Sequence, residues 1–191
     1  MKCLTYAESD AWFASFGVKI IENRSLSFPV RARKERRMFI TDFQINAPRL
    51  IYFSDQLVDW LPNGRERMLW LRSWETYPVN QTIFFERVRR GSNENRHIIE
   101  APGHLFESST HDREDYDNRT AYEHEENAII AGLLILVVCF NWDAYLVAHG
   151  REDYVRIQDN GIMLCSPNDS KIEEASAIAR KFNQKFRELP S

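Results

Sequence analysis

The chain has 191 residues, of which 43% are hydrophobic and 28% charged, with a formal net charge of −3. This length suits a single domain over 1–191, and this composition excludes a disordered chain because it can bury a core. Three widely spaced cysteines, Cys3, Cys139 and Cys165, exclude a disulfide framework and a cysteine-based zinc site. The N-terminus reaches Glu8 without an apolar stretch, so we expect no signal peptide and a cytoplasmic protein.

The N-terminal half predicts a short helix followed by strands. Thr5 and Glu8 have the spacing of a capping box, and Gly17 suits the left-handed position that ends a helix. A second short helix is expected over 54–61, where Pro62 would end it. The segments with strand composition are 18–21, 38–40, 50–53, 67–74, and the pair 82–89 and 96–100, which we expect to form a hairpin.

The C-terminal half contains the strongest helix signals. Thr120 and Glu123 form a second capping box before an uncharged run over 128–140. This run predicts an apolar helix over about 121–139, buried on nearly every side and with Cys139 in the core. It is too short to cross a bilayer, which takes about 20 apolar residues. Ser170 begins a third capping box, and apolar residues at helical spacing predict an amphipathic C-terminal helix over about 171–188.

The order of the elements predicts the fold class. Strands are also expected over 143–147, 154–157 and 162–165, joined by short turns at Gly150 and at Asn160-Gly161. Strands at hairpin distances without regular β-α-β alternation indicate an α+β fold with a mainly antiparallel sheet. We expect the apolar helix to pack across one face of that sheet.

An acidic segment is the first candidate functional feature. Eight acidic residues and two arginines lie between 107 and 126. Its densest part consists of Asp112, Glu114, Asp115 and Asp117. Carboxylates at this density attract a basic partner such as a nuclease domain, so we predict that these four residues bind a basic protein.

The same segment leaves a metal-assisted hydrolase open as the alternative. His104, His111 and His124 lie near or among the acids of 104–126, and imidazole with carboxylates can hold a catalytic metal. The spacing matches neither a calcium loop nor a His-Glu-x-x-His helix. The sequence also lacks a nucleophile elbow and a glycine-rich phosphate loop. We therefore predict no cofactor and no metal, and favour a non-catalytic protein.

Trp70, Arg72 and Trp74 are the second candidate. Alternate residues of a strand share one face, and tryptophan beside arginine is typical of an interface. The alternative is that the tryptophans fill the core under the apolar helix.

The basic run over 31–37 predicts an exposed loop or an edge strand. It has no interleaved aromatic residues and no surrounding nucleic-acid motif, so we do not expect a nucleic-acid partner.

The segment Phe140-Asn141-Trp142-Asp143-Ala144-Tyr145-Leu146-Val147 follows the apolar run and leads into a short hairpin. This organisation, over 128–165, resembles small cytoplasmic proteins of the bacterial polymorphic-toxin immunity class. The resemblance implies a catalytically inert protein that neutralises a toxin by masking it, and it assigns no residues. The sequence thus predicts a protein-binding domain, and it leaves the oligomeric state open.

Overall fold

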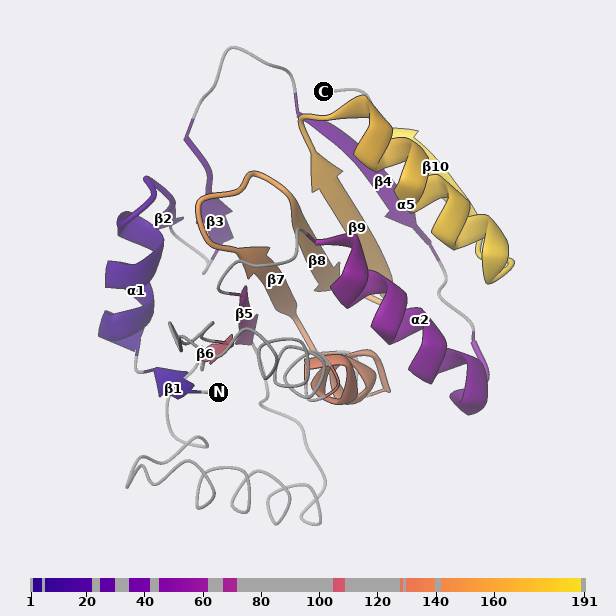
Figure 1. Cartoon of the computed structure of the whole chain (residues 1–191), viewed down its shortest axis with the longest axis horizontal. Helices are drawn as coiled ribbons and strands as arrows, with labels where there is room; N and C mark the ends of the chain where they lie inside the picture. The colour runs from indigo at the N-terminus through magenta and orange to yellow at the C-terminus, as the bar shows by residue number, and fades with distance from the viewer. Residues whose placement is uncertain are drawn as a thin grey trace, which may run out of the picture.

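The computed structural model describes residues 2–4, 6–21, 25–29, 35–41, 45–61, 67–71, 105–108, 128, 130–139 and 142–189. Eight strands form one antiparallel sheet with helices packed against it, which is the α+β fold expected from the sequence (Figure 1). The strand order is β1-β6-β5-β7-β8-β9-β4-β10. These strands are β1 Lys2–Leu4, β4 Arg36–Ile40, β5 Arg67–Leu71, β6 Leu105–Ser108, β7 Ala144–Ala148, β8 Tyr154–Gln158, β9 Gly161–Ser166 and β10 Phe186–Leu189.

The other labelled elements surround this sheet. Strands β2 and β3 pair as a separate two-stranded sheet. The bounds of these elements are α1 Tyr6–Ala14, β2 Lys19–Ile21, β3 Ser25–Ser27, α2 Ala47–Trp60 and α5 Asp169–Lys181. A further helix occupies residues 130–139. Within the part of the chain that is described, no helix is both long and apolar enough to cross a membrane.

Alternate strand residues fill two separate cores, one on each face of the sheet. Leu69 and Leu71 of β5 face the core formed with α2, α5 and the 130–139 helix. Met68 and Trp70 of the same strand face the opposite core, which contains Phe13 of α1. All five residues of β5 are buried, as is usual for a strand covered on both faces.

The meander β7-β8-β9 confirms the strands and turns expected for this part of the sequence. Gln158 pairs with Gly161 across a two-residue turn. The central residues Asp159 and Asn160 have φ values of 52° and 57°. Positive φ at both central positions gives the turn the twist of a hairpin, and Asp and Asn tolerate this conformation better than most residues.

Helix α2 corrects the prediction of a strand over 50–53. The helix begins before this segment, where the Asn46 side chain accepts a hydrogen bond from the Arg49 backbone N–H and Pro48 lies in the first turn. Leu50, Phe53 and Leu57 then recur at helical spacing and are buried. The bulky residues of 50–53 suit a strand locally, but this longer apolar face places them in a helix.

Helix α5 is shorter than the predicted helix over 171–188. Its N-cap is Asn168, whose side chain accepts from the Ser170 backbone N–H. The helix ends at Lys181, and Asn183 adopts a left-handed conformation with φ 56°. The chain then forms β10, which pairs with β4. Arg37 of β4 pairs with both β9 and β10, so the predicted edge strand is wrong for this residue, whereas Arg36 pairs with Ser166 of β9 alone in the described register.

The apolar helix is present over 130–139 and is buried on most of its sides, with one exposed side. Ile130, Leu133, Leu134 and Val137 pack into the core. Gly132 and Cys139 are exposed, so Cys139 is not the buried hydrophobe that the sequence predicted. The predicted hairpin over 82–100 lies outside the described residues.

Candidate protein-interaction surface

The side of α2 that points away from the sheet is a mixed apolar and acidic surface. It consists of Ile51, Tyr52, Asp55 and Asp59; Ile51 and Tyr52 lie four and three residues before Asp55 and Asp59 lies four after it, so all three neighbour Asp55 on the helix surface. We call this set the α2 outer face. Tyr52 is 67% exposed and Ile51 is 52% exposed. Two large apolar side chains exposed side by side on one helix are typical of an interaction surface.

The two carboxylates make this face electrostatically unfavourable for the isolated protein. Partial burial raises the pKa of Asp55 above its ordinary value, and the neighbouring charge of Asp59 raises it further. Both lie in the C-terminal half of α2, and the last turn of this helix has no basic residue. Since the C-terminal end of a helix dipole is negative, carboxylates there lower stability.

The face is held on a rigid support. Helices α2 and α5 lie side by side on the sheet (Figure 1). The Arg49 guanidinium at the start of α2 donates to the Lys181 carbonyl at the end of α5 over 3.0 Å. At the opposite ends, Lys171 Nζ donates to the Trp60 carbonyl over 2.7 Å, so the helices run antiparallel. Each helix therefore supplies a cation to a C-terminal carbonyl of the other.

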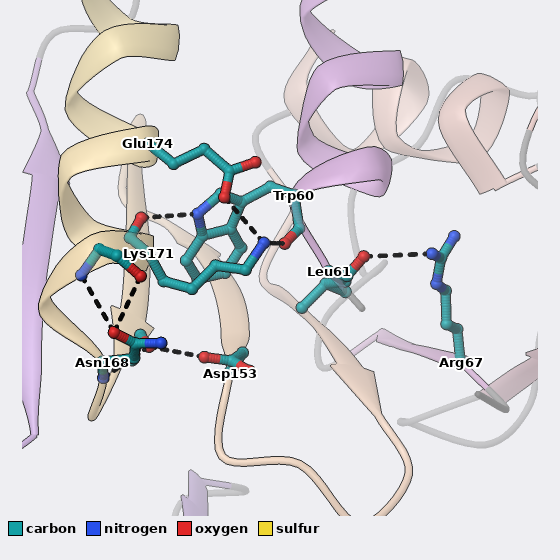
Figure 2. Close-up of polar contacts among 9 residues, drawn as sticks. Trp60, Leu61, Arg67, Asp153, Asn168, Lys171 and Glu174 are labelled. Carbon is teal, nitrogen blue, oxygen red and sulfur yellow. Dashed lines mark hydrogen bonds and ion pairs between the residues drawn. The ribbon is translucent and has the colours of Figure 1, made fainter. Parts of the chain in front are cut away.

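The contact between the end of α2 and the start of α5 consists of two hydrogen bonds between Trp60 and Lys171. Figure 2 shows the Lys171 side chain extended along the Trp60 indole, and the Trp60 Nε1–H donates to the Lys171 carbonyl over 2.9 Å. Lys171 Nζ also donates to Glu174 Oε2 over 2.8 Å. Trp60 itself has no exposed surface. A surface on a helix anchored in this way loses little conformational entropy on binding.

Of the site residues predicted from the sequence, Trp70 is the one that the described ranges include. Asp112, Glu114, Asp115, Asp117, Arg72 and Trp74 are outside the described residues. Trp70 is fully buried, with its ring centroid 5.5 Å from that of Phe13 and 5.8 Å from that of Tyr145. It therefore has no surface to offer a partner, and the core interpretation is correct for this residue. Its core is the one beside α1, however, and not the one under the apolar helix.

The described residues do not assemble the chemistry of the hydrolase alternative. His104, His111 and His124 lie outside them, and within them no three His, Cys, Asp or Glu residues are close enough to hold a metal ion. Ser15 Oγ lies 3.0 Å from His149 Nε2, but this hydroxyl donates to the Trp12 carbonyl over 2.6 Å. The Ser15 proton is thus committed to the backbone, so the contact fixes α1 to the β7-β8 turn.

A polar cluster around Tyr154 and Cys165, which pair between β8 and β9, has a structural role. Tyr154 OH donates to Glu35 Oε1 over 2.7 Å, and the Phe28 ring stacks on the Tyr154 ring at 4.3 Å. Burial raises the pKa of the neighbouring Cys165 thiol well above its ordinary value. A thiol that stays protonated is a poor nucleophile, so Cys165 is not suited to covalent catalysis.

The sequence does not reveal the α2 outer face because the residues of 50–53 favour a strand, in which Ile51 and Tyr52 would lie on opposite sides. A helical reading from Asn46 and Pro48 would have found it. Comparison with protein-family models, with curated proteins and with solved structures gives no match for this chain. The resemblance to toxin-immunity proteins therefore stays a prediction.

Proposed function

We propose that this chain is a non-catalytic protein-binding domain of the bacterial cytoplasm that neutralises a toxin by covering it. The observation that carries this proposal is the α2 outer face, where Tyr52 and Ile51 are largely exposed beside two carboxylates. Aromatic and aliphatic side chains supply affinity at such surfaces, and the charges select the partner and speed its approach. Asp112, Glu114, Asp115 and Asp117 are predicted to add to the same attraction.

The test compares three forms of the full chain as bait in lysate at low and moderate salt. The face variant carries Ile51→Ser, Tyr52→Ser, Asp55→Asn and Asp59→Asn. The control variant makes matched changes at exposed positions elsewhere, namely Ile21→Ser, Asp10→Asn and Glu173→Gln. Ile21 is 50% exposed, so it loses about as much apolar surface as Ile51.

We expect wild type and control to capture the same protein, with capture falling as salt rises, and the face variant to lose it. Expression of the captured protein should arrest bacterial growth, and co-expression of wild type, but not of the face variant, should restore it. Capture that the face variant retains in full would refute the role of α2. A captured protein without toxicity would refute neutralisation.

A further inference from the structure

We infer that the α2 outer face receives an arginine-bearing basic helix of a partner protein, with one guanidinium held between Asp55 and Tyr52 and a second cation on Asp59. This inference deepens the proposed function and rests on it for its biological use. The binding itself can be measured without the natural partner.

The spacing of the two carboxylates suits a helical partner. Asp55 and Asp59 are four residues apart, so they lie one turn apart along α2, at a rise of about 6 Å. Two cations four residues apart on a partner helix have the same rise and can face both carboxylates together. Ile51 lies one turn before Asp55 and would contact an apolar residue in the next turn of that helix.

The position of Tyr52 favours arginine over lysine at the first contact. Tyr52 is three residues before Asp55 and is 67% exposed, so an exposed aromatic side chain neighbours the half-buried carboxylate on the helix surface. A guanidinium can form a paired hydrogen bond to a carboxylate while its flat face stacks on an aromatic ring. A lysine ammonium makes only a point contact at such a site.

Among the described residues, the cations on α2 and on the adjoining ends of α5 take part in other hydrogen bonds. Arg49 of α2 donates to the Lys181 carbonyl. On α5, Lys171 binds the Trp60 carbonyl and Glu174, and Lys181 Nζ donates to Gln56 over 3.1 Å. In the part of the chain that is described, these cations hold other partners, so an external cation would relieve the repulsion between Asp55 and Asp59.

The same charges disfavour a second copy of this chain as the occupant. A twofold contact between two α2 outer faces would bring together four carboxylates and no described basic side chain of that face. Burying carboxylates without a cation costs free energy. A basic partner removes this cost.

The test uses a synthetic, end-blocked helical peptide with two arginines one turn apart and a leucine one turn beyond them. Binding to the full chain is measured by calorimetry, and its location by the backbone amide shifts of isotope-labelled protein. We expect shifts centred on 51–59. Replacement of the first arginine by lysine should weaken binding several-fold, and replacement of both by citrulline by about tenfold or more. Asp55→Asn with Asp59→Asn should cause a similar loss, whereas Asp10→Asn with Glu173→Gln should leave affinity unchanged.

Equal affinity for the arginine and citrulline peptides, or shifts centred away from α2, would overturn the inference. A concentration-dependent dimer of the chain alone that Tyr52→Ser abolishes would assign the face to a second copy and would also overturn it. The two proposals can fail separately. A peptide that binds at α2 when no partner is captured from lysate refutes the proposed function alone. A toxin captured equally by wild type and face variant refutes this inference alone.

Discussion

Helices α2 and α5 are neighbours on the same side of the sheet and are built alike, yet their charges are arranged in opposite ways. Each begins with an asparagine cap and buries an apolar face. Helix α5 has Asp169 in its first turn and Arg180 and Lys181 in its last turn, which is the arrangement that the helix dipole favours. Helix α2 has no acid in its first turn, no base in its last turn, and Asp55 and Asp59 near its C-terminal end.

The difference separates charges that stabilise the fold from charges that do not. The outer charges of α5 support the helix that carries them. Those of α2 oppose their own helix, and they lie beside the largest exposed aromatic side chain of the described residues. Residues that lower stability without a local gain are characteristic of functional surfaces. The comparison therefore points to α2 as the binding helix and to α5 as its support.

The largest expected effect tests whether α2 and α5 form one structural unit. The Phe53 and Phe182 rings meet edge to face at 5.2 Å, and both side chains are buried. Phe182→Ala should lower the free energy of unfolding by about 3 kcal/mol because it leaves a cavity between the helices. The measurement is urea unfolding of Phe53→Ala, of Phe182→Ala and of the double variant that carries both. A double variant whose loss is less than additive by about 1 kcal/mol would show direct coupling, whereas strict additivity would contradict it.

The next effect tests the contact between the ends of the two helices. Lys171→Met keeps most of the side-chain volume but removes the ammonium from the Trp60 carbonyl and Glu174 (Figure 2). We expect a loss of about 1.5 kcal/mol in the free energy of unfolding. Lys185→Met, at an exposed position, is the control and should change it by less than about 0.5 kcal/mol. Equal losses in the free energy of unfolding for the two variants would show that this contact does not stabilise α2.

The two helices also differ in how far the sequence predicts them. Helix α5 is found from its sequence because its acidic start, its apolar residues at helical spacing and its basic end all agree. Its end is misplaced because Phe186 continues the spacing while only Asn183 marks the stop, and asparagine is a weaker signal than glycine. Helix α2 is half missed because bulky residues at 50–53 favour a strand locally, and tertiary packing against the sheet decides otherwise.

The candidate site is likewise only partly predictable from the sequence. An acidic, aromatic interaction surface can be predicted as a kind of site from composition and charge. Its place on α2 depends on the helical assignment of Ile51 and Tyr52, which local propensity obscures. The burial of Trp70 depends on α1 packing across β5, a long-range contact that strand alternation alone does not reveal.

A smaller effect tests the cost of the α2 carboxylates. Asp55→Asn with Asp59→Asn should raise the free energy of unfolding at neutral pH by about 1 kcal/mol, since it removes the repulsion between the two carboxylates, the partial burial of the Asp55 charge, and the Asp59 charge that opposes the helix dipole in the last turn. The pKa of Asp55 is raised in the folded protein, so its ionised form lowers stability above that pKa. The advantage of Asp55→Asn should therefore shrink as the pH falls through the folded pKa toward the ordinary value of 3.8. Urea unfolding between neutral and acidic pH measures it, and a variant less stable than wild type at neutral pH would contradict the interpretation.

The smallest expected effect comes from the opposite kind of substitution on α5, which removes a favourable charge. Arg180→Gln removes a cation from the last turn, where it favours the helix dipole and where its guanidinium lies 5.6 Å from the centre of the Phe186 ring. We expect a loss of about 0.5 kcal/mol in the free energy of unfolding, opposite in sign to the α2 result. Because both effects act through exposed charges, both should diminish in high salt. Partner capture should also separate them, since the α2 substitutions stabilise the fold while weakening binding, and Arg180→Gln destabilises the fold while leaving binding intact. The two helices should show opposite effects on both stability and binding only if the charges of α2 serve binding and those of α5 serve stability.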